Sequence, residues 1–151
     1  HDEVEAIVVG LALLGRTGDQ GLEQAAQCAA AKISDVLPED TGRVAPLHVS
    51  RWNTIPTARI APATLRRYIR EEAELDITYV DLGAELTQRV IRPLALVYYI
   101  DSVLLAAWCD LRQAFRHFRI DRIESCTPTG AHFSAQSEAL VRRWEQENAV
   151  P

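Results

Sequence analysis

The sequence contains no methionine, only three cysteines, and no apolar run near the roughly 20 residues that a membrane-spanning helix requires. Its N-terminus also lacks the basic segment and following apolar stretch of a secretory signal peptide. These absences predict a cytoplasmic protein that has no membrane partner. Because translation begins with methionine, we also expect further residues upstream of His1.

The cysteines and histidines do not form a metal-binding or catalytic pattern. Cys28, Cys109 and Cys126 are odd in number and far apart, which is untypical of a disulfide framework or a zinc site. We expect reduced thiols, and a buried, unreactive one at Cys109 within its apolar run. The histidines have no nucleophile or carboxylate at a useful spacing, and no phosphate-binding loop, HExxH or GxSxG motif occurs. We therefore predict that the chain is not an enzyme and uses no cofactor or metal.

The net charge of −5 argues against a protein that coats nucleic acid, because binding to phosphates requires a positive field. One short segment has the opposite charge. Residues 112–122 contain four arginines and one aspartate, which gives a local net charge of +3. The sequence therefore predicts an acidic protein with one basic site.

Residues 1–40 are predicted to form a hairpin of two helices. Apolar residues recur at helical spacing from Val4 to Leu14, and a second helix extends from Gln20 to Leu37, where Pro38 ends it. A DNA-reading helix-turn-helix would have the same outline. The second helix has only Lys32 as a basic residue, and reading DNA requires a basic face. We therefore interpret the pair as an interaction hairpin.

Residues 41–135 are predicted to form the main domain. After a turn-rich crossing segment with one short strand, Pro62 begins a third helix that we place at 62–74. Period-two alternation then indicates four strands, at 77–80, 87–99, 103–109 and 115–123. Pro93 interrupts the second strand, and we expect a bend or a bulge there.

Four or five strands at this short spacing favour an α+β fold built on a small antiparallel β-barrel. The remaining residues, 136–151, include a periodic apolar pattern that predicts a C-terminal helix. No internal repeat or low-complexity segment interrupts this organisation.

Three segments of the main domain resemble the WYL domain. They read Arg89-Val-Ile-Arg-Pro-Leu-Ala-Leu-Val-Tyr-Tyr, Leu105-Ala-Ala-Trp-Cys and Phe115-Arg-His-Phe-Arg-Ile-Asp-Arg-Ile. The family pattern is an arginine two to four residues before Pro-Leu, a buried strand, and then Arg-x-Phe-Arg-x-x-Arg-Ile. Ile77-Thr-Tyr79 resembles the family's first strand.

The N-terminal helices and their Leu37-Pro38-Glu39 stop resemble the linker that joins a winged helix-turn-helix to a WYL domain in YafY-like regulators. In all, the resemblance spans most of residues 3–135. The sequence departs from the family at Val103-Leu104-Leu105, where the Trp-Tyr-Leu tripeptide that names the family would stand. A ligand contact made by that tyrosine hydroxyl is therefore not expected in this chain.

The resemblance implies an SH3- or Sm-like barrel that senses a ligand, a nucleotide or single-stranded nucleic acid, and tunes an attached DNA-binding domain. We expect that domain to lie outside these residues, and operator DNA to be bound only through it. The chain would then be the effector-sensing region of a transcription regulator.

The residue chemistry independently favours an anion site. Guanidinium groups bind phosphate oxygens bidentately and stack on bases, and tyrosine supplies a stacking face. The candidate ligand-binding residues are Tyr79, Arg89, Arg112, Arg116, His117, Arg119 and Arg122. In one extended strand, Arg116 and Arg122 would share a face at a separation of about 20 Å, which only an extended ligand could span. The same alternation places His117 and Arg119 on the opposite face.

An alternative interpretation makes the arginines structural. They could form a surface network of ion pairs with nearby aspartates, namely Asp76, Asp81, Asp101, Asp110 and Asp121. The chain would then serve as a dimerisation or protein-interaction module of the regulator. In both interpretations we expect a homodimer, because two-fold symmetry suits a palindromic operator.

Overall fold

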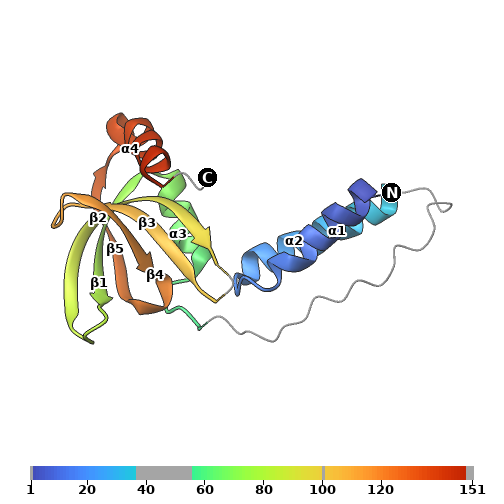
Figure 1. The fold of residues 1–151 in the computed structure, drawn as a ribbon, viewed down its shortest axis with the longest axis horizontal. Helices are drawn as coiled ribbons and strands as arrows, with labels where there is room; N and C mark the ends of the chain where they lie inside the picture. The colour runs from blue at the N-terminus through green and yellow to red at the C-terminus, as the bar shows by residue number, and fades with distance from the viewer. Residues whose placement is uncertain (1, 37–55, 100, 149–151) are drawn as a thin grey trace. The chain divides into compact units, whose positions relative to one another are not determined.

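The computed structural model describes residues 2–36, 56–99 and 101–148, and the chain divides into two compact units, His1–Pro56 and Thr57–Pro151. Figure 1 shows the elements of both units. The strand expected in the crossing segment falls within residues 37–55, which lie outside the described residues. Among the described residues, no helix is both long enough and apolar enough to cross a membrane.

The first unit contains the predicted pair of helices, α1 (Asp2–Leu14) and α2 (Gln20–Val36). Asp19, which is 2% exposed, ends the turn between them. Its carboxylate accepts a hydrogen bond of 3.1 Å from the backbone N–H of Leu22, which satisfies a free donor at the start of α2. Among the described residues of this unit, one apolar side chain is buried, that of Ala26.

The second unit is a five-stranded antiparallel sheet with two α-helices and one 3-10 turn. In chain order the elements are α3 (Pro62–Arg70), β1 (Ala73–Val80), β2 (Leu86–Tyr98), β3 (Val103–Cys109), β4 (Ala114–Arg119), η1 (Ile120–Arg122), β5 (Ile123–His132) and α4 (Ser134–Glu147). The strands lie in the order β4-β3-β2-β1-β5. The α+β class is therefore confirmed.

The expected barrel is wrong, because the sheet is open. Closing a barrel requires its two outer strands to pair, and no pairing joins β4 to β5 among the described strands. β4 has only six residues, and η1 then turns the chain away, so that β5 pairs with β1 instead.

Two element boundaries also differ from expectation. The helix expected over 62–74 ends at Arg70, and Glu72 takes a φ of 52° in the left-handed region, which an α-helix cannot continue through. Ala73, 4% exposed, belongs to β1. The strand expected over 115–123 is divided by η1. β5, which follows, contains Pro128. An outer strand tolerates proline, because the backbone groups on one of its edges do not hydrogen-bond to a neighbouring strand.

The core lies between α3 and the sheet. The largest fully buried apolar side chains are Leu65, Leu75, Ile77, Ile91, Val103, Leu105 and Ile123. Leu65 lies on α3, which packs against β1 and β2 (Figure 1). The irregularity predicted at Pro93, a bend or a bulge, is confirmed, since the register of β2 against β3 shifts between Pro93 and Ala95. This core fixes β1, β2 and β3, each of which contributes a residue to the wall of the cavity described next.

Candidate functional site

A cavity of about 440 Å³ brings together six of the seven candidate residues. They come from β1, β2, the β3–β4 turn, β4 and η1, and they are Tyr79, Arg89, Arg112, Arg116, His117 and Arg122. We call this the arginine cavity. The seventh candidate, Arg119, lines an adjoining cavity of about 450 Å³. The two cavities share four wall residues, namely Tyr79, Leu82, His117 and Arg122.

η1 changes the geometry expected for the basic segment. β4 ends at Arg119, and the next three residues form a 3-10 turn, so strand alternation does not continue to Arg122. Arg116 and Arg122 line the same cavity, and so does His117, which alternation had placed on the opposite face. The expected separation of about 20 Å assumed one extended strand, and that assumption does not hold, because η1 follows β4.

The arginine cavity has a strongly positive wall. Four arginines line it with a single carboxylate, that of Asp81. One oxygen of that carboxylate, Oδ1, accepts hydrogen bonds of 2.8 and 3.0 Å from the backbone N–H groups of Gly83 and Glu85. These bonds hold the β1–β2 turn, so the carboxylate has a structural role.

The ion-pair alternative does not account for the arginines of this cavity. In the described part of the chain, no carboxylate lies within 4.0 Å of the guanidinium groups of Arg112, Arg116 and Arg122. Arg89 contacts a hydroxyl instead, with 3.3 Å between its Nε and Oγ1 of Thr87. These four side chains can therefore turn their donors toward an anion.

Arg119 behaves as the alternative predicted. Its Nε and Nη2 each lie 3.1 Å from a carboxylate oxygen of Asp121, which makes a bidentate pair. The hydrogen bond to Asp121 raises the pKa of Arg119 above its usual value. Because both Asp121 oxygens are engaged, Arg119 has a neutralising partner, and the other four arginines have none in the described ranges of the chain.

Tyr79 forms the wall between the two cavities. Its ring meets Phe118 edge to face, with 5.1 Å between the ring centres and an angle of 81°. Its hydroxyl oxygen accepts a hydrogen bond of 3.4 Å from the backbone N–H of Arg119. Packing on one side and this bond at the tip fix the ring, so it offers a rigid aromatic surface.

His117 is engaged from outside the cavity. Its Nε2 lies 3.2 Å from Nε1 of Trp144 on α4. Since the indole group can only donate, Nε2 must be unprotonated to accept. Burial lowers the pKa of His117 below 6.5, which favours the same neutral form.

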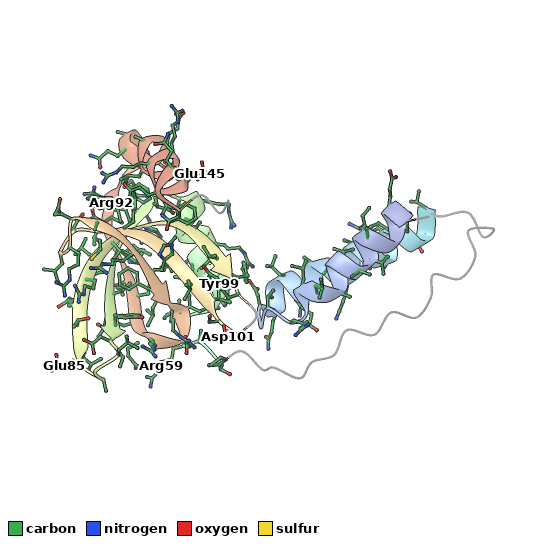
Figure 2. All side chains as sticks on the ribbon, in the orientation of Figure 1. Arg59, Glu85, Arg92, Tyr99, Asp101 and Glu145 are labelled. Carbon is green, nitrogen blue, oxygen red and sulfur yellow. The ribbon has the colours of Figure 1, made fainter. Side chains whose placement is uncertain are left out.

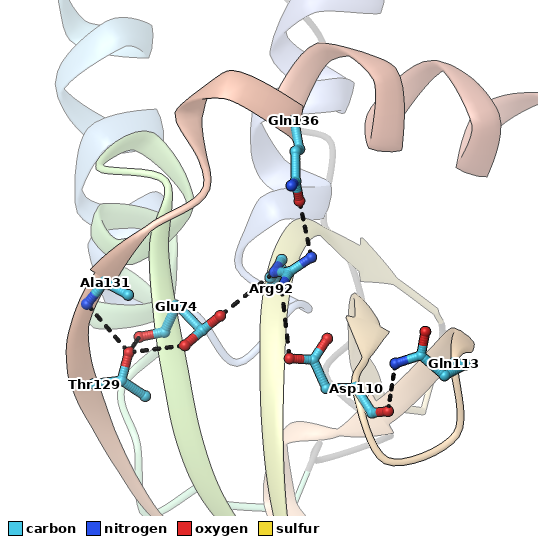
Figure 3. Close-up of polar contacts among 7 residues, drawn as sticks. All are labelled: Glu74, Arg92, Asp110, Gln113, Thr129, Ala131 and Gln136. Atoms are coloured by element: carbon cyan, nitrogen blue, oxygen red, sulfur yellow. Dashed lines mark hydrogen bonds and ion pairs between the residues drawn. The ribbon is translucent and has the colours of Figure 1, made fainter.

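Arg92 belongs to the fold and not to the cavity, although it stands in the same Pro-Leu motif as Arg89. Its side chain is 24% exposed and lies 3.4 Å from Glu74 and 3.6 Å from Asp110. A third bond, of 2.9 Å, joins it to Gln136 of α4 (Figure 3). Arg92 thereby connects β1, the β3–β4 turn and α4, and it fixes the start of α4 against the sheet.

Sequence reasoning missed Leu82 as a site residue. It lies at the tip of the β1–β2 turn, is 90% exposed, and lines both cavities. A large apolar residue at the tip of a polar hairpin was the available signal. Tyr99 and Leu104, which line the adjoining cavity, were also missed. Leu104 is the middle residue of the Val103–Leu105 tripeptide, at the position where the resemblance predicted a tyrosine.

The cysteines are free thiols in the described residues, and Cys109 is 1% exposed, as predicted. Burial raises the pKa of Cys126 to about 11, which keeps it protonated and unreactive at neutral pH. The described residues contain no group of three or more histidine, cysteine, aspartate or glutamate side chains that could hold a metal ion.

Comparison with known proteins connects this site to a family. Residues 61–128 match the WYL domain. Among solved structures, the chain is similar to proteasome accessory factor B/C (PafBC) of Arthrobacter aurescens, at 28% sequence identity and a TM-score of 0.47. The alignment covers 91% of this chain and 21% of that one. The chain therefore spans about a fifth of the protein it matches.

Proposed function

We propose that this chain, whose residues 61–128 match the WYL domain, is the effector-sensing region of a transcription regulator. The arginine cavity binds an anionic effector, a nucleotide or single-stranded nucleic acid. Arg89, Arg112, Arg116 and Arg122 contact its phosphate oxygens, and Tyr79 contacts its aromatic part. DNA reading belongs to a separate domain of the regulator.

The observation that carries this proposal is a set of four arginines around one cavity that have no carboxylate partner among the described residues. Like charges held close together repel, and a low-dielectric wall strengthens the repulsion. A bound phosphate removes the repulsion and accepts several charge-assisted hydrogen bonds at once. The proposal thus explains why the sequence concentrates basic residues in an otherwise acidic protein.

A second role, dimerisation, is supported by a different observation. Two apolar side chains of α1, Ile7 and Leu13, are 48% and 44% exposed. α1 also carries apolar residues around most of its circumference, and a helix of that kind is usually covered on more than one side. We propose that the helical hairpin pairs with a second copy while the WYL domain senses the effector.

Isothermal titration calorimetry with inorganic pyrophosphate, nucleoside monophosphates and short single-stranded oligonucleotides tests the effector role. At least one probe is expected to bind, and at a hundredfold excess over Kd it should stabilise the protein by about 2.7 kcal/mol. Arg116→Ala and Arg122→Ala should weaken that binding. Arg142→Ala is the matched control, because Arg142 lies on α4 in an exposed pair with Glu138. Failure of every probe to bind at millimolar concentration would refute the proposed function.

A further inference from the structure

The adjoining cavity differs in chemistry from the arginine cavity. Its wall includes two tyrosines and two leucines, namely Tyr79, Tyr99, Leu82 and Leu104. Of the two arginines that reach it, Arg119 is already neutralised by its bidentate pair with Asp121. A carboxylate, that of Asp101, also lines it. This second space is therefore less positive than the arginine cavity, and it suits an apolar, flat group better than a phosphate.

The carboxylate of Asp101 is held in a defined orientation at the β2–β3 turn. Ser102, which is 8% exposed, donates a hydrogen bond of 3.1 Å from its Oγ to Oδ1 of Asp101. The backbone N–H of Tyr99 donates to the carbonyl of Ser102 at 2.8 Å, which closes the turn. Figure 2 shows Tyr99 and Asp101 at this end of the sheet. An aromatic face and a hydrogen-bond acceptor thus stand side by side in one cavity.

This combination discriminates between kinds of apolar group. Because Oδ1 of Asp101 already accepts a hydrogen bond from Ser102, an acyl chain in the adjoining cavity would offer no donor to the other carboxylate oxygen, which is costly once water is excluded. A nucleobase instead offers a face to the tyrosine rings and N–H groups at its edge. An ionised carboxylate only accepts hydrogen bonds, so it favours a base with an exocyclic amino group over one whose edge is mostly carbonyl.

We propose that the effector is a nucleoside phosphate whose phosphate lies in the arginine cavity and whose amino-bearing base lies in the adjoining cavity, between Tyr79, Leu82 and Asp101. This inference rests on the proposed function and adds the second compartment to it. The two cavities meet at Tyr79, so one ligand passes from one to the other beside that ring. Each volume falls within the range of about 300–1,000 Å³ that is usual for small-ligand sites.

The test compares inorganic pyrophosphate with AMP, CMP, GMP and UMP by calorimetry on the full chain. The three amino-bearing nucleotides are expected to bind about tenfold or more tightly than pyrophosphate, because base stacking adds to the phosphate contacts. UMP is expected to bind about fivefold more weakly than CMP, which differs from it mainly at the amino position. A further set of titrations uses single-stranded oligonucleotides that carry the same base as each nucleotide. Comparing the two affinities shows whether the site prefers a free nucleotide or a nucleotide within a strand.

Two exposed variants isolate the second compartment with little risk to folding. Tyr99→Ala, at a side chain that is 55% exposed and that lines the adjoining cavity but not the arginine cavity, should weaken CMP binding about fivefold or more and leave pyrophosphate binding unchanged. Asp101→Asn should abolish the preference of CMP over UMP, since an amide can both donate and accept. Arg116→Ala should weaken pyrophosphate and nucleotides alike.

The outcomes separate the two proposals. If no probe binds, the proposed function fails and this inference fails with it. If pyrophosphate binds as tightly as every nucleotide, and Tyr99→Ala changes neither, the arginine cavity is an anion site and the second compartment is refuted. If nucleotides bind more tightly than pyrophosphate but Asp101→Asn leaves CMP and UMP in the same ratio, base selection by Asp101 is refuted.

Discussion

The indole Nε1 of Trp144 donates a hydrogen bond of 3.2 Å to Nε2 of His117, and this bond joins α4 to the wall of the arginine cavity. A second contact supports the same end of α4. The guanidinium group of Arg143 lies over the rings of Trp108 and Phe115, 5.3 Å from each centre. Because Trp144 can donate but not accept, the bond exists only while His117 is neutral.

His117 should therefore make stability depend on pH. Burial lowers its pKa below 6.5 in the folded chain, whereas the unfolded chain keeps a value near 6.5. Its contribution is then present above about pH 6.5 and lost as the pH falls through the folded pKa. Between pH 7 and 5, urea unfolding of the parent should lose more stability than that of His117→Gln. The difference should stay below about 1 kcal/mol, because His117 is partly exposed to screening water.

Nuclear magnetic resonance titration provides the direct measurement. The imidazole of His117 should titrate below 6.5, and the Trp144 indole N–H signal should shift with the same midpoint. A His117 that titrates at or above 6.5 in the unliganded protein would contradict the neutral, hydrogen-bonded state.

Arg92→Ala should destabilise the second unit by about 1–3 kcal/mol, because it leaves Glu74 and Asp110 without their shared cation. Water that contacts the exposed 24% of the Arg92 side chain screens these ion pairs and keeps the loss within this range. Arg142→Ala serves as control, since an exposed i,i+4 pair contributes only about 0.3–0.5 kcal/mol. Urea unfolding measures both. If both variants lowered the free energy of unfolding by the same small amount, the polar network in Figure 3 would not stabilise the second unit.

Arg89 and Arg92 illustrate what the sequence could and could not provide. Both precede the Pro-Leu motif, and a sequence pattern accepts either as the ligand-binding arginine. Their numbers differ by three, so on one strand their side chains project to opposite faces. Arg89 reaches the cavity, and Arg92 reaches the network that fixes α4. Which face of β2 meets the cavity depends on how β2 pairs with β1 and β3. The local pattern of apolar and polar residues does not predict that long-range pairing.

The elements with strong local signals were predicted well. The helical pair and the apolar strands β2 and β3 follow from periodicity and from proline positions. The 3-10 turn at Ile120–Arg122 was missed, because alternating apolar and basic residues also fit a continuous strand. That turn leaves the sheet open and brings Arg122 to the cavity wall of Arg116. A single irregular turn therefore changed both the predicted fold and the predicted site geometry.

A homodimer is expected in solution, with a mass of twice 16.8 kDa by light scattering at tens of micromolar. Replacing Ile7 and Leu13 together by lysine should produce monomers, because both are exposed apolar residues on α1. Leu111→Lys is the matched control, since Leu111 is also exposed but lies in the β3–β4 turn. A monomeric parent, or dissociation caused equally by Leu111→Lys, would count against the hairpin as the dimer surface.

Salt dependence should distinguish ligand-binding arginines from structural ones. The logarithm of an association constant falls linearly with the logarithm of salt concentration, with a slope set by the number of phosphates that are neutralised. Each of Arg116→Ala and Arg122→Ala should reduce the slope for a single-stranded oligonucleotide by about 0.7, the value of one lost phosphate contact. Neither arginine has a carboxylate within 4.0 Å among the described residues, so their removal should change stability by less than about 0.5 kcal/mol.

Arg119→Ala provides the contrast within the same segment. It leaves Asp121, whose side chain is only 17% exposed, without its bidentate partner. We expect it to lower the free energy of unfolding by about 1 kcal/mol and to leave the salt slope close to that of the parent. The reverse pattern, with Arg116→Ala or Arg122→Ala costing more than about 2 kcal/mol at an unchanged slope, would make these arginines structural and assign the basic segment to the fold.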